Sequence, residues 1–192
     1  MKFTTAAIAA TAASLVSAAP PQSHVEYAEI KDNDVFHIMS LRTGTEIQHG
    51  NLQAANNGLY LNAPNQNATC GAEHASFQLN NGTLNLYTKA PSQSIYVDRS
   101  GMGQGVIGYT TGAQPAPKNA QREGWAINKD SYLVWRDDNG TELNFQACAP
   151  ALGGGYAVWL SGVPNPAGYK DCIPFTALAL KEDDAVLCQY TQ

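Results

Sequence analysis

Hydrophobic residues in this chain occur in short runs that are separated by turn-forming residues. Most runs are three to six residues long, and no window keeps the 3.6-residue period of an amphipathic helix. The segment Ser-Ile-Tyr-Val-Asp at 94–98 is β-branched and aromatic, as strands prefer. The pattern predicts an all-β fold, with strands at 36–41, 59–61, 76–79, 84–87, 95–97, 106–109, 125–127, 132–135, 143–147, 156–160 and 177–180.

Asn-Gly pairs lie between several of these runs, at 57–58, 81–82 and 139–140. Asn-Gly is the strongest two-residue hairpin signal, because both central positions of a type I′ turn need a positive φ angle. The pairs therefore predict antiparallel hairpins. The stretch 112–123 has no apolar run and is expected to be a long exposed loop.

A degenerate internal repeat is visible in three segments. Residues 52–61, 77–86 and 125–134 share an outline of polar residues followed by a short apolar run. Three repeated hairpin pairs are what a β-trefoil requires, so a β-trefoil-like domain is the preferred prediction. A β-sandwich of ten or more short strands is the alternative.

The N-terminal residues have the pattern of a secretory signal peptide. A short basic start is followed by a small apolar stretch at 6–16, and Val16-Ser17-Ala18 suits signal-peptidase cleavage. A buried N-terminal helix is the alternative interpretation. We expect a signal peptide at 1–18, a flexible leader at 19–34 and a single all-β domain at 35–192.

The charge of the chain argues against some classes of binding partner. It has 11 basic and 16 acidic residues, a formal net charge of −5 and no Lys/Arg run, which argues against nucleic acid and anionic membranes. The body of the chain has no apolar run long enough for a membrane span. Residues 181–192 lack the hydrophobic tail of a lipid-anchor signal, so no membrane anchor is expected.

The cysteines and the glycosylation motifs agree with secretion. Cys70, Cys148, Cys172 and Cys188 form an even set, which in an oxidising compartment predicts two disulfides with three open pairings. A zinc site is the alternative, but the chain has no CxxC or HxxxH spacing. N-glycosylation is predicted at three Asn-x-Thr motifs, at Asn67, Asn81 and Asn139.

Catalytic signals are weak. A GxGxxG pattern at 103–108 lacks the βαβ context of a dinucleotide site and is better explained as a glycine-rich turn. Asp137, Asp138 and Glu142 flank one turn and could suggest the carboxylate pair of a glycoside hydrolase, but adjacent acidic residues on a hairpin loop point in different directions. The acidic run 182–184 is expected to be solvated. The chain has no Gly-x-Ser-x-Gly motif, and its histidines are scattered at 24, 37, 49 and 74. We expect no enzyme activity, no cofactor and no metal.

Aromatic residues lie in or beside most of the predicted strands. Trp125 and Trp159 have apolar neighbours in the sequence, which predicts that both lie in the core. Trp135 precedes Arg-Asp-Asp and is the best candidate for an exposed ring that stacks on a sugar. The wider aromatic set is Tyr60, Tyr87, Tyr96, Tyr109, Trp125, Tyr132, Trp135, Tyr156, Trp159 and Tyr169.

The order of several short motifs resembles the PhiA-like cell wall proteins of filamentous ascomycetes. The resemblance rests on segments 36–44, 47–55, 93–98, 145–148 and 170–172 and covers nearly the whole predicted domain. A weaker similarity, at 70–84 and 123–133 and in the late cysteines, is to the C-terminal domain of PIR-type wall mannoproteins. The Gln-rich repeats by which PIR proteins attach to glucan are missing here.

The resemblance implies a secreted, glycosylated cell wall protein. PhiA-like proteins are linked to conidiophore development and are IgE-binding antigens, and neither property supplies a catalytic residue. By the same analogy and loop length, we expect Cys148–Cys172 and Cys70–Cys188 as the disulfides.

Three classes of function follow. The preferred one is a non-catalytic wall protein with a structural or developmental role, whose partners are wall polysaccharide or wall proteins. A carbohydrate-binding, lectin-like module is the alternative, and an enzyme acting on wall polysaccharide is the least favoured because an acid/base pair is lacking. A secreted effector or protease inhibitor also stays open.

Overall fold

The computed structural model describes residues 27–192. The predicted signal peptide and residues 19–26 of the predicted leader lie outside the described residues. Residues 27–34 lead into the first strand through a turn in which the Asp34 N–H donates to the Lys31 carbonyl, at 3.0 Å. In this part of the chain, no helix is both long and apolar enough to cross a membrane.

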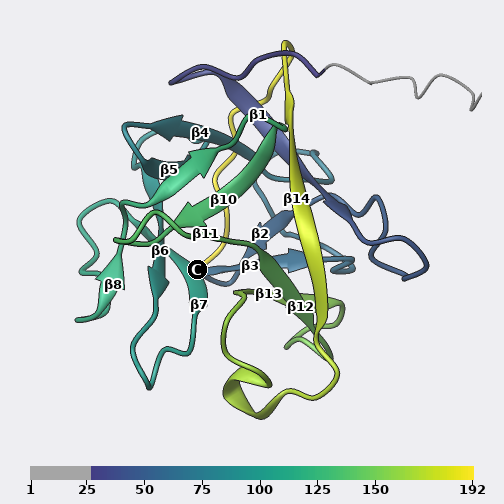
Figure 1. Cartoon of the computed structure of the whole chain (residues 1–192). Helices are drawn as coiled ribbons and strands as arrows, with labels where there is room; N and C mark the ends of the chain where they lie inside the picture. The colour runs from purple at the N-terminus through teal and green to yellow at the C-terminus, as the bar shows by residue number, and fades with distance from the viewer. Residues whose placement is uncertain (1–26) are drawn as a thin grey trace, which may run out of the picture.

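Strands and turns account for almost all of the regular structure between residues 27 and 192 (Figure 1). A short 3-10 helix, η1, spans Pro166–Gly168. The strands are β1 (Val35–Leu41), β2 (Gln53–Ala55), β3 (Gly58–Leu61), β4 (Ser76–Asn80), β5 (Thr83–Leu86), β6 (Gln93–Asp98), β7 (Val106–Thr111), β8 (Ala120–Gln121), β9 (Trp125–Ile127), β10 (Tyr132–Arg136), β11 (Glu142–Leu143), β12 (Phe145–Cys148), β13 (Tyr156–Leu160) and β14 (Ile173–Lys181).

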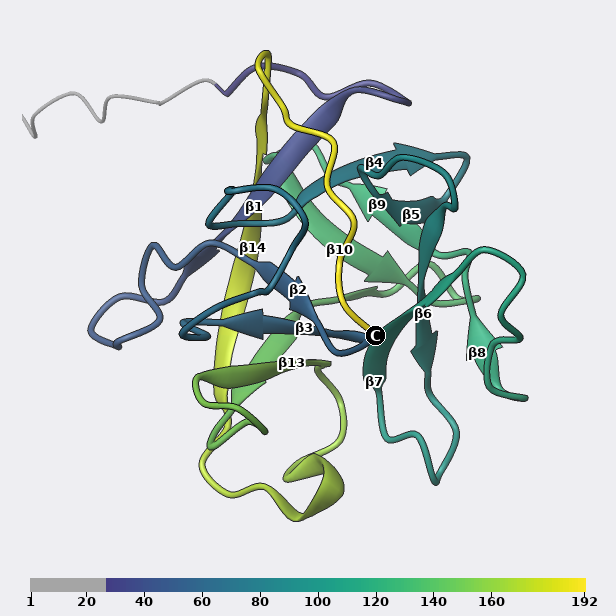
Figure 2. The same cartoon turned by 180° about the vertical axis from the view of Figure 1, so that it is seen from behind.

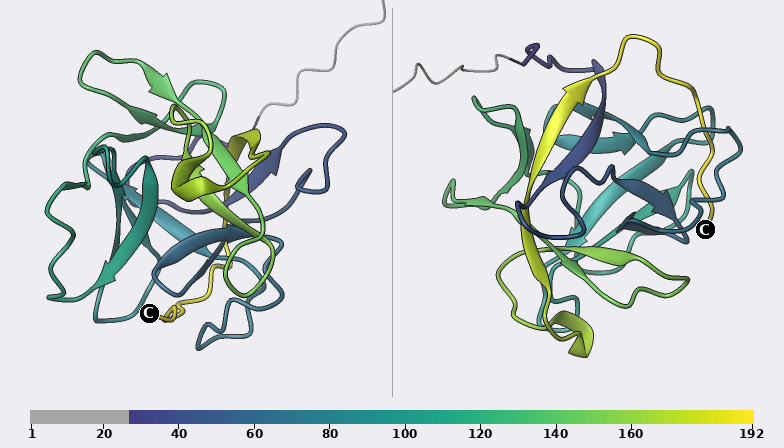
Figure 3. Two further views of the ribbon diagram at one scale, coloured as in Figure 1. Left: turned by 90° about the horizontal axis from the view of Figure 1, so that it is seen from below. Right: turned by 90° about the vertical axis from the view of Figure 1, so that its right-hand side faces the viewer.

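Nine antiparallel strands form a closed ring. Their order is β1-β4-β5-β6-β7-β3-β13-β12-β14, and β14 pairs with β1 to complete the circle. The closing pair runs in register from Phe36 opposite Lys181 to Leu41 opposite Thr176, and Figure 3 shows the two strands side by side. Of the remaining strands, β2 pairs with β3, β8 with β6 and β10 with β14, while β9 and β11 pair with β10. The all-β prediction is confirmed.

The three repeat segments each fold as an antiparallel hairpin: β2 with β3, β4 with β5, and β9 with β10. The turn between β4 and β5 has Asn81 and Gly82 at its centre, both with positive φ. In the β2–β3 hairpin the central residues are Asn56 and Asn57, one position earlier than the Asn-Gly pair predicts. The β-trefoil arrangement and the β-sandwich alternative both remain predictions.

The structure contains strand segments that the hydrophobic pattern does not predict. The short strands β2 and β8 carry few large apolar residues, and β8 lies within the stretch expected to be a loop. The predicted strand at 143–147 is split into β11 and β12, with Asn144 between them. β14 begins four residues before the predicted segment and includes Pro174, a residue that normally argues against a central strand.

The strands form one hydrophobic core, to which most of them contribute buried residues that alternate with more exposed ones. One part is aromatic: Trp125 packs edge-on against Trp135 at 5.2 Å between ring centroids, and it also stacks on Phe145. The prediction of Trp135 as an exposed sugar-stacking residue is wrong, because its side chain is 2% exposed. Trp135 lies opposite both Trp125 and Leu143, so flanking strands cover it, while the charged residues after it occupy a turn.

Two disulfides join Cys70 to Cys188 and Cys148 to Cys172, the pairing that the resemblance implies. The first attaches the C-terminal segment, residues 182–192, to the loop between β3 and β4. The segment runs from the end of β14 to a C-terminus beside β3 and β7 (Figure 2).

Polar contacts hold the C-terminal segment along this path. Tyr190 exchanges two hydrogen bonds with Gln93, which is itself fully buried, and the Tyr109 hydroxyl donates to the Thr191 carbonyl. Both Cys188 and Tyr190 are buried. Cys188 and Tyr190 thus belong to the core and, with these hydrogen bonds, fix the C-terminal segment on the ring.

Candidate functional site

A groove of about 230 Å³ lies on the outer face of the ring, where β3, β7 and β13 are neighbours. Four aromatic side chains line it: Tyr60, Tyr96, Trp159 and Tyr169. Two larger hollows lie elsewhere, around Gln66 and beside β8, but their described lining contains no aromatic side chain. We call the aromatic one the aromatic groove.

Strand alternation explains why these rings face outward. Tyr60, Tyr96 and Trp159 each stand between two buried residues of their strand, so their own side chains point away from the ring interior. Register then brings the strands together: Tyr60 lies opposite Ala157 on β13, and Trp159 lies opposite Val106 on β7. Tyr169 follows η1, and its ring centroid lies 6.1 Å from that of Trp159.

Two glycines form part of the groove floor. Gly58 and Gly108 are paired across β3 and β7, and Gly108 is also opposite Tyr96 on β6. A Cβ atom on Gly108 would lie 2.6 Å from the Tyr96 hydroxyl oxygen, and one on Gly58 would lie 3.1 Å from that of Tyr60. The glycines thus let both tyrosine rings lie against the backbone, which leaves the groove open above them.

The aromatic groove suits a neutral, polyhydroxylated ligand. Burial raises the pKa of Tyr60 and of Tyr96, so both hydroxyls stay protonated and can donate hydrogen bonds. Asn56 and Asn57 add amide groups at the edge of the groove. Apolar ring faces bordered by hydroxyl and amide groups are the combination that binds sugar rings.

Two of the acidic residues considered in the sequence, Asp137 and Glu142, have structural partners. Glu142 accepts hydrogen bonds from Arg136, at 2.9 Å, and from Asn128, at 3.2 Å. Asp137 accepts the backbone N–H groups of Asn139 and Thr141, which fixes the turn between β10 and β11. The glycine-rich pattern at 103–108 lies in the turn between β6 and β7 and the first residues of β7. These groups organise turns and do not face one another across a cleft.

The three glycosylation motifs lie on the surface. Asn67 is in the loop between β3 and β4, Asn81 is at the tip of the β4–β5 hairpin, and Asn139 is in the turn after β10. All three asparagine side chains are exposed. The fold leaves each motif accessible to a glycan.

Three of the groove aromatics, Tyr60, Tyr96 and Tyr169, stand out in the sequence only as members of a larger aromatic set. Trp125 is buried as expected, whereas Trp159 is partly exposed and lines the groove, so the core prediction is wrong for Trp159. The periodicity of β13, in which Trp159 alternates with buried Val158 and Leu160, was the available signal. Residues far apart in sequence also meet at His37, His74 and Glu182, and no spacing rule detects such a group. The expectation of a solvated acidic run is wrong for Glu182, because its side chain is only 13% exposed and contacts both histidines.

The closed all-β ring, its two disulfides and its aromatic groove define a disulfide-stabilised β protein of the extracellular type. A family profile described as PhiA-like secreted protein matches residues 36–191. A protein named cell wall protein phiA from Emericella nidulans is 37% identical over 196 residues, and one from Aspergillus fumigatus is 38% identical over 197 residues. Both alignments cover the full length of both chains.

A more distant relative with the same name, from Arthroderma benhamiae, is 31% identical over 156 residues, which cover 76% of this chain and 82% of the relative. No solved structure matches this chain significantly. The chain belongs to the PhiA-like family of secreted proteins. Family and relatives together place it among secreted cell wall proteins.

Proposed function

We propose that the protein is a non-catalytic, N-glycosylated structural component of the fungal cell wall with a role in conidiation. The closed β ring and its two disulfides support a structural role, because disulfides stabilise a folded domain outside the cell. The conidiation role rests on the family resemblance. Deletion of the gene should reduce conidium number and raise sensitivity to wall-binding dyes, and normal values for both would contradict this role.

The glycosylation part of the proposal rests on three accessible motifs at Asn67, Asn81 and Asn139. Enzymatic release of N-glycans from the secreted protein should lower its mass and convert the modified asparagines to aspartate. Intact-mass and peptide spectra that show three unmodified asparagines would contradict it.

A second function, binding of wall polysaccharide, is favoured by the aromatic groove. Tyr60, Tyr96, Trp159 and Tyr169 gather on one outer face although they come from four separate segments of the chain. Aromatic rings on an accessible surface would stack against the apolar faces of sugar rings, while the tyrosine hydroxyls bond to sugar hydroxyls. In this proposal, the groove holds the protein non-covalently on a neutral glucan, chitin or mannan.

Depletion by insoluble polysaccharide tests the second function. The deglycosylated protein should be removed from solution in a saturable manner by at least one of chitin, β-1,3-glucan and mannan. Tyr169→Ala should weaken that binding about fivefold, because a stacked ring contributes on the order of 1 kcal/mol. Tyr169 follows η1 and belongs to no strand, so we expect the variant to keep the wild-type circular dichroism spectrum.

The matched control is Tyr27→Ala, which removes an exposed aromatic residue that precedes β1 and lies outside the groove. It should bind as the wild type does. Equal binding by the wild type, Tyr169→Ala and Trp159→Ala, or no depletion by any of the three polymers, would exclude the groove as a polysaccharide site.

A further inference from the structure

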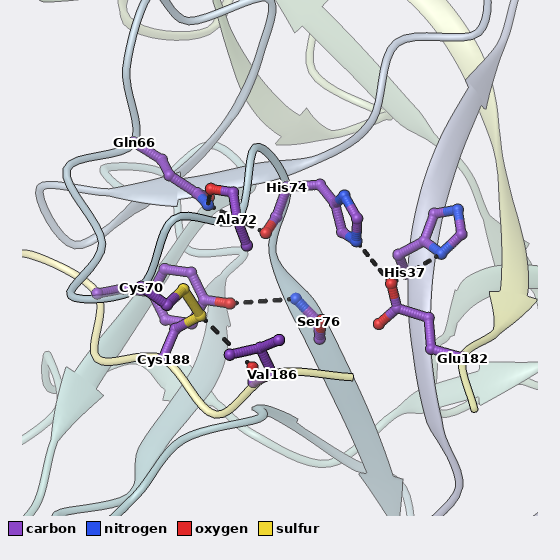
Figure 4. Close-up of polar contacts among 10 residues, drawn as sticks. His37, Gln66, Cys70, Ala72, His74, Ser76, Glu182, Val186 and Cys188 are labelled. Carbon is purple, nitrogen blue, oxygen red and sulfur yellow. Dashed lines mark hydrogen bonds and ion pairs between the residues drawn. A yellow bond between two sulfur atoms is a disulfide. The ribbon is translucent and has the colours of Figure 1, made fainter. Parts of the chain in front are cut away.

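Two histidines and a glutamate, none of which lines the aromatic groove, meet beside β1 (Figure 4). His37 is on β1, His74 is in the loop before β4, and Glu182 is the first residue after β14. β1 pairs with both β4 and β14, with His37 opposite Ser76 and opposite Leu180. The Glu182 N–H donates to the Val35 carbonyl at 2.9 Å, which fixes the glutamate beside β1.

The donor atoms of the three side chains converge. Glu182 Oε1 lies 2.6 Å from His74 Nε2 and 3.2 Å from His37 Nδ1, and one ligand atom from each residue lies within 4.8 Å of the others. The imidazole centroids are 4.9 Å apart. The side chains are 19%, 29% and 13% exposed for His37, His74 and Glu182, so the group is largely shielded but open to a small ion.

The group is not satisfied by its own hydrogen bonds. His37 Nδ1, which lies 3.2 Å from Glu182 Oε1, and Glu182 Oε2 are both buried without a hydrogen-bond partner. Within residues 27–192, Glu182 forms ion pairs with the two histidines and with no lysine or arginine. A largely buried carboxylate that faces two imidazoles and keeps one oxygen unpaired is suited to a cation.

We propose that His37, His74 and Glu182 bind a divalent transition-metal ion, with zinc as the favoured occupant. Two imidazole nitrogens and one carboxylate oxygen are a recognised zinc donor set, whereas calcium and magnesium prefer oxygen ligands alone. The donor atoms need only small side-chain movements to surround one ion.

The site would have a structural consequence, because it joins the same two segments that a disulfide joins. His74 lies four residues after Cys70, and Glu182 lies six residues before Cys188. Zinc would thus be a second cross-link between the β3–β4 loop and the C-terminal segment, and it would also attach both to β1.

Zinc titration of the untagged protein by calorimetry tests the proposal. We expect one ion per chain in the wild type and a rise in thermal midpoint on zinc addition. His74→Gln and Glu182→Gln should each weaken binding by at least about tenfold. Cobalt(II) should bind at the same site with visible absorption bands of nitrogen and oxygen ligation, a readout that a purely structural role of these residues does not produce.

His49→Gln is the matched control, since His49 is an exposed histidine outside the group. It should bind zinc as the wild type does. His74→Gln should keep the metal-free thermal midpoint of the wild type, because His74 lies in a loop and is partly exposed. The proposal is overturned if the folded wild type takes up no zinc, or if His74→Gln and Glu182→Gln bind it as the wild type does.

Discussion

Replacement of both Cys70 and Cys188 with alanine should lower the free energy of unfolding by about 4–5 kcal/mol, the loop-entropy contribution of a bridge this long. The bridge spans 118 residues, so its removal frees a large part of the unfolded chain. It also releases the C-terminal segment, in which Cys188 and Tyr190 are buried. Urea denaturation followed by tryptophan fluorescence measures the change.

The Cys148→Ala/Cys172→Ala pair is the control for that experiment. Its bridge spans 24 residues, for which the same relation gives about 3 kcal/mol. The Cys70–Cys188 bridge should therefore have the larger effect. A larger loss in the Cys148–Cys172 variant would mean that the C-terminal segment contributes little to stability.

Trp135→Ala should lower the free energy of unfolding by about 3–5 kcal/mol, as expected for truncation of a large buried aromatic residue. Trp135 is 2% exposed, packs edge-on against Trp125 and leaves no room for a Cβ atom at Gly124. Thermal or urea denaturation of the purified variant gives the value.

Trp159→Ala is the matched tryptophan variant, and it should cost clearly less stability because Trp159 lies partly exposed on the outer face. Truncation of a core aromatic residue costs more than about 1 kcal/mol of unfolding free energy. If Trp135→Ala stays within about 1 kcal/mol of the wild type, the assignment of Trp135 to the core is wrong.

The sequence predicts the strands better than it predicts their partners. The β-branched and aromatic run Ile-Tyr-Val marks β6 in the sequence, and in the structure Ile95 and Val97 are buried while Tyr96 between them is not. No such run marks β8, which has two residues and packs by backbone pairing with β6. Closure of the ring depends on the pairing of β1 with β14, whose paired residues are more than 130 positions apart in the sequence. No local sequence pattern specifies a pairing between such distant segments.

The candidate sites were harder to predict than the strands, because they depend on which strands lie side by side. Charged residues after Trp135 suggested an exposed ring, but neighbours from β9 and β11 bury it. Apolar neighbours of Trp159 suggested a core position, although alternation on β13 turns its side chain outward. His37 and Glu182 meet because β1 and β14 are paired, which becomes visible only once the ring is closed.

Binding of neutral wall polysaccharide is the function that the outer aromatic groove supports, and the three indole N–H signals test it most directly. Soluble oligosaccharides of β-1,3-glucan, chitin and mannan would be titrated into ¹⁵N-labelled protein. We expect at least one of these sugars to shift the Trp159 signal in a saturable manner and to leave the signals of the buried Trp125 and Trp135 in place. No shift with any of the three sugars, or shifts confined to residues outside the groove, would contradict it.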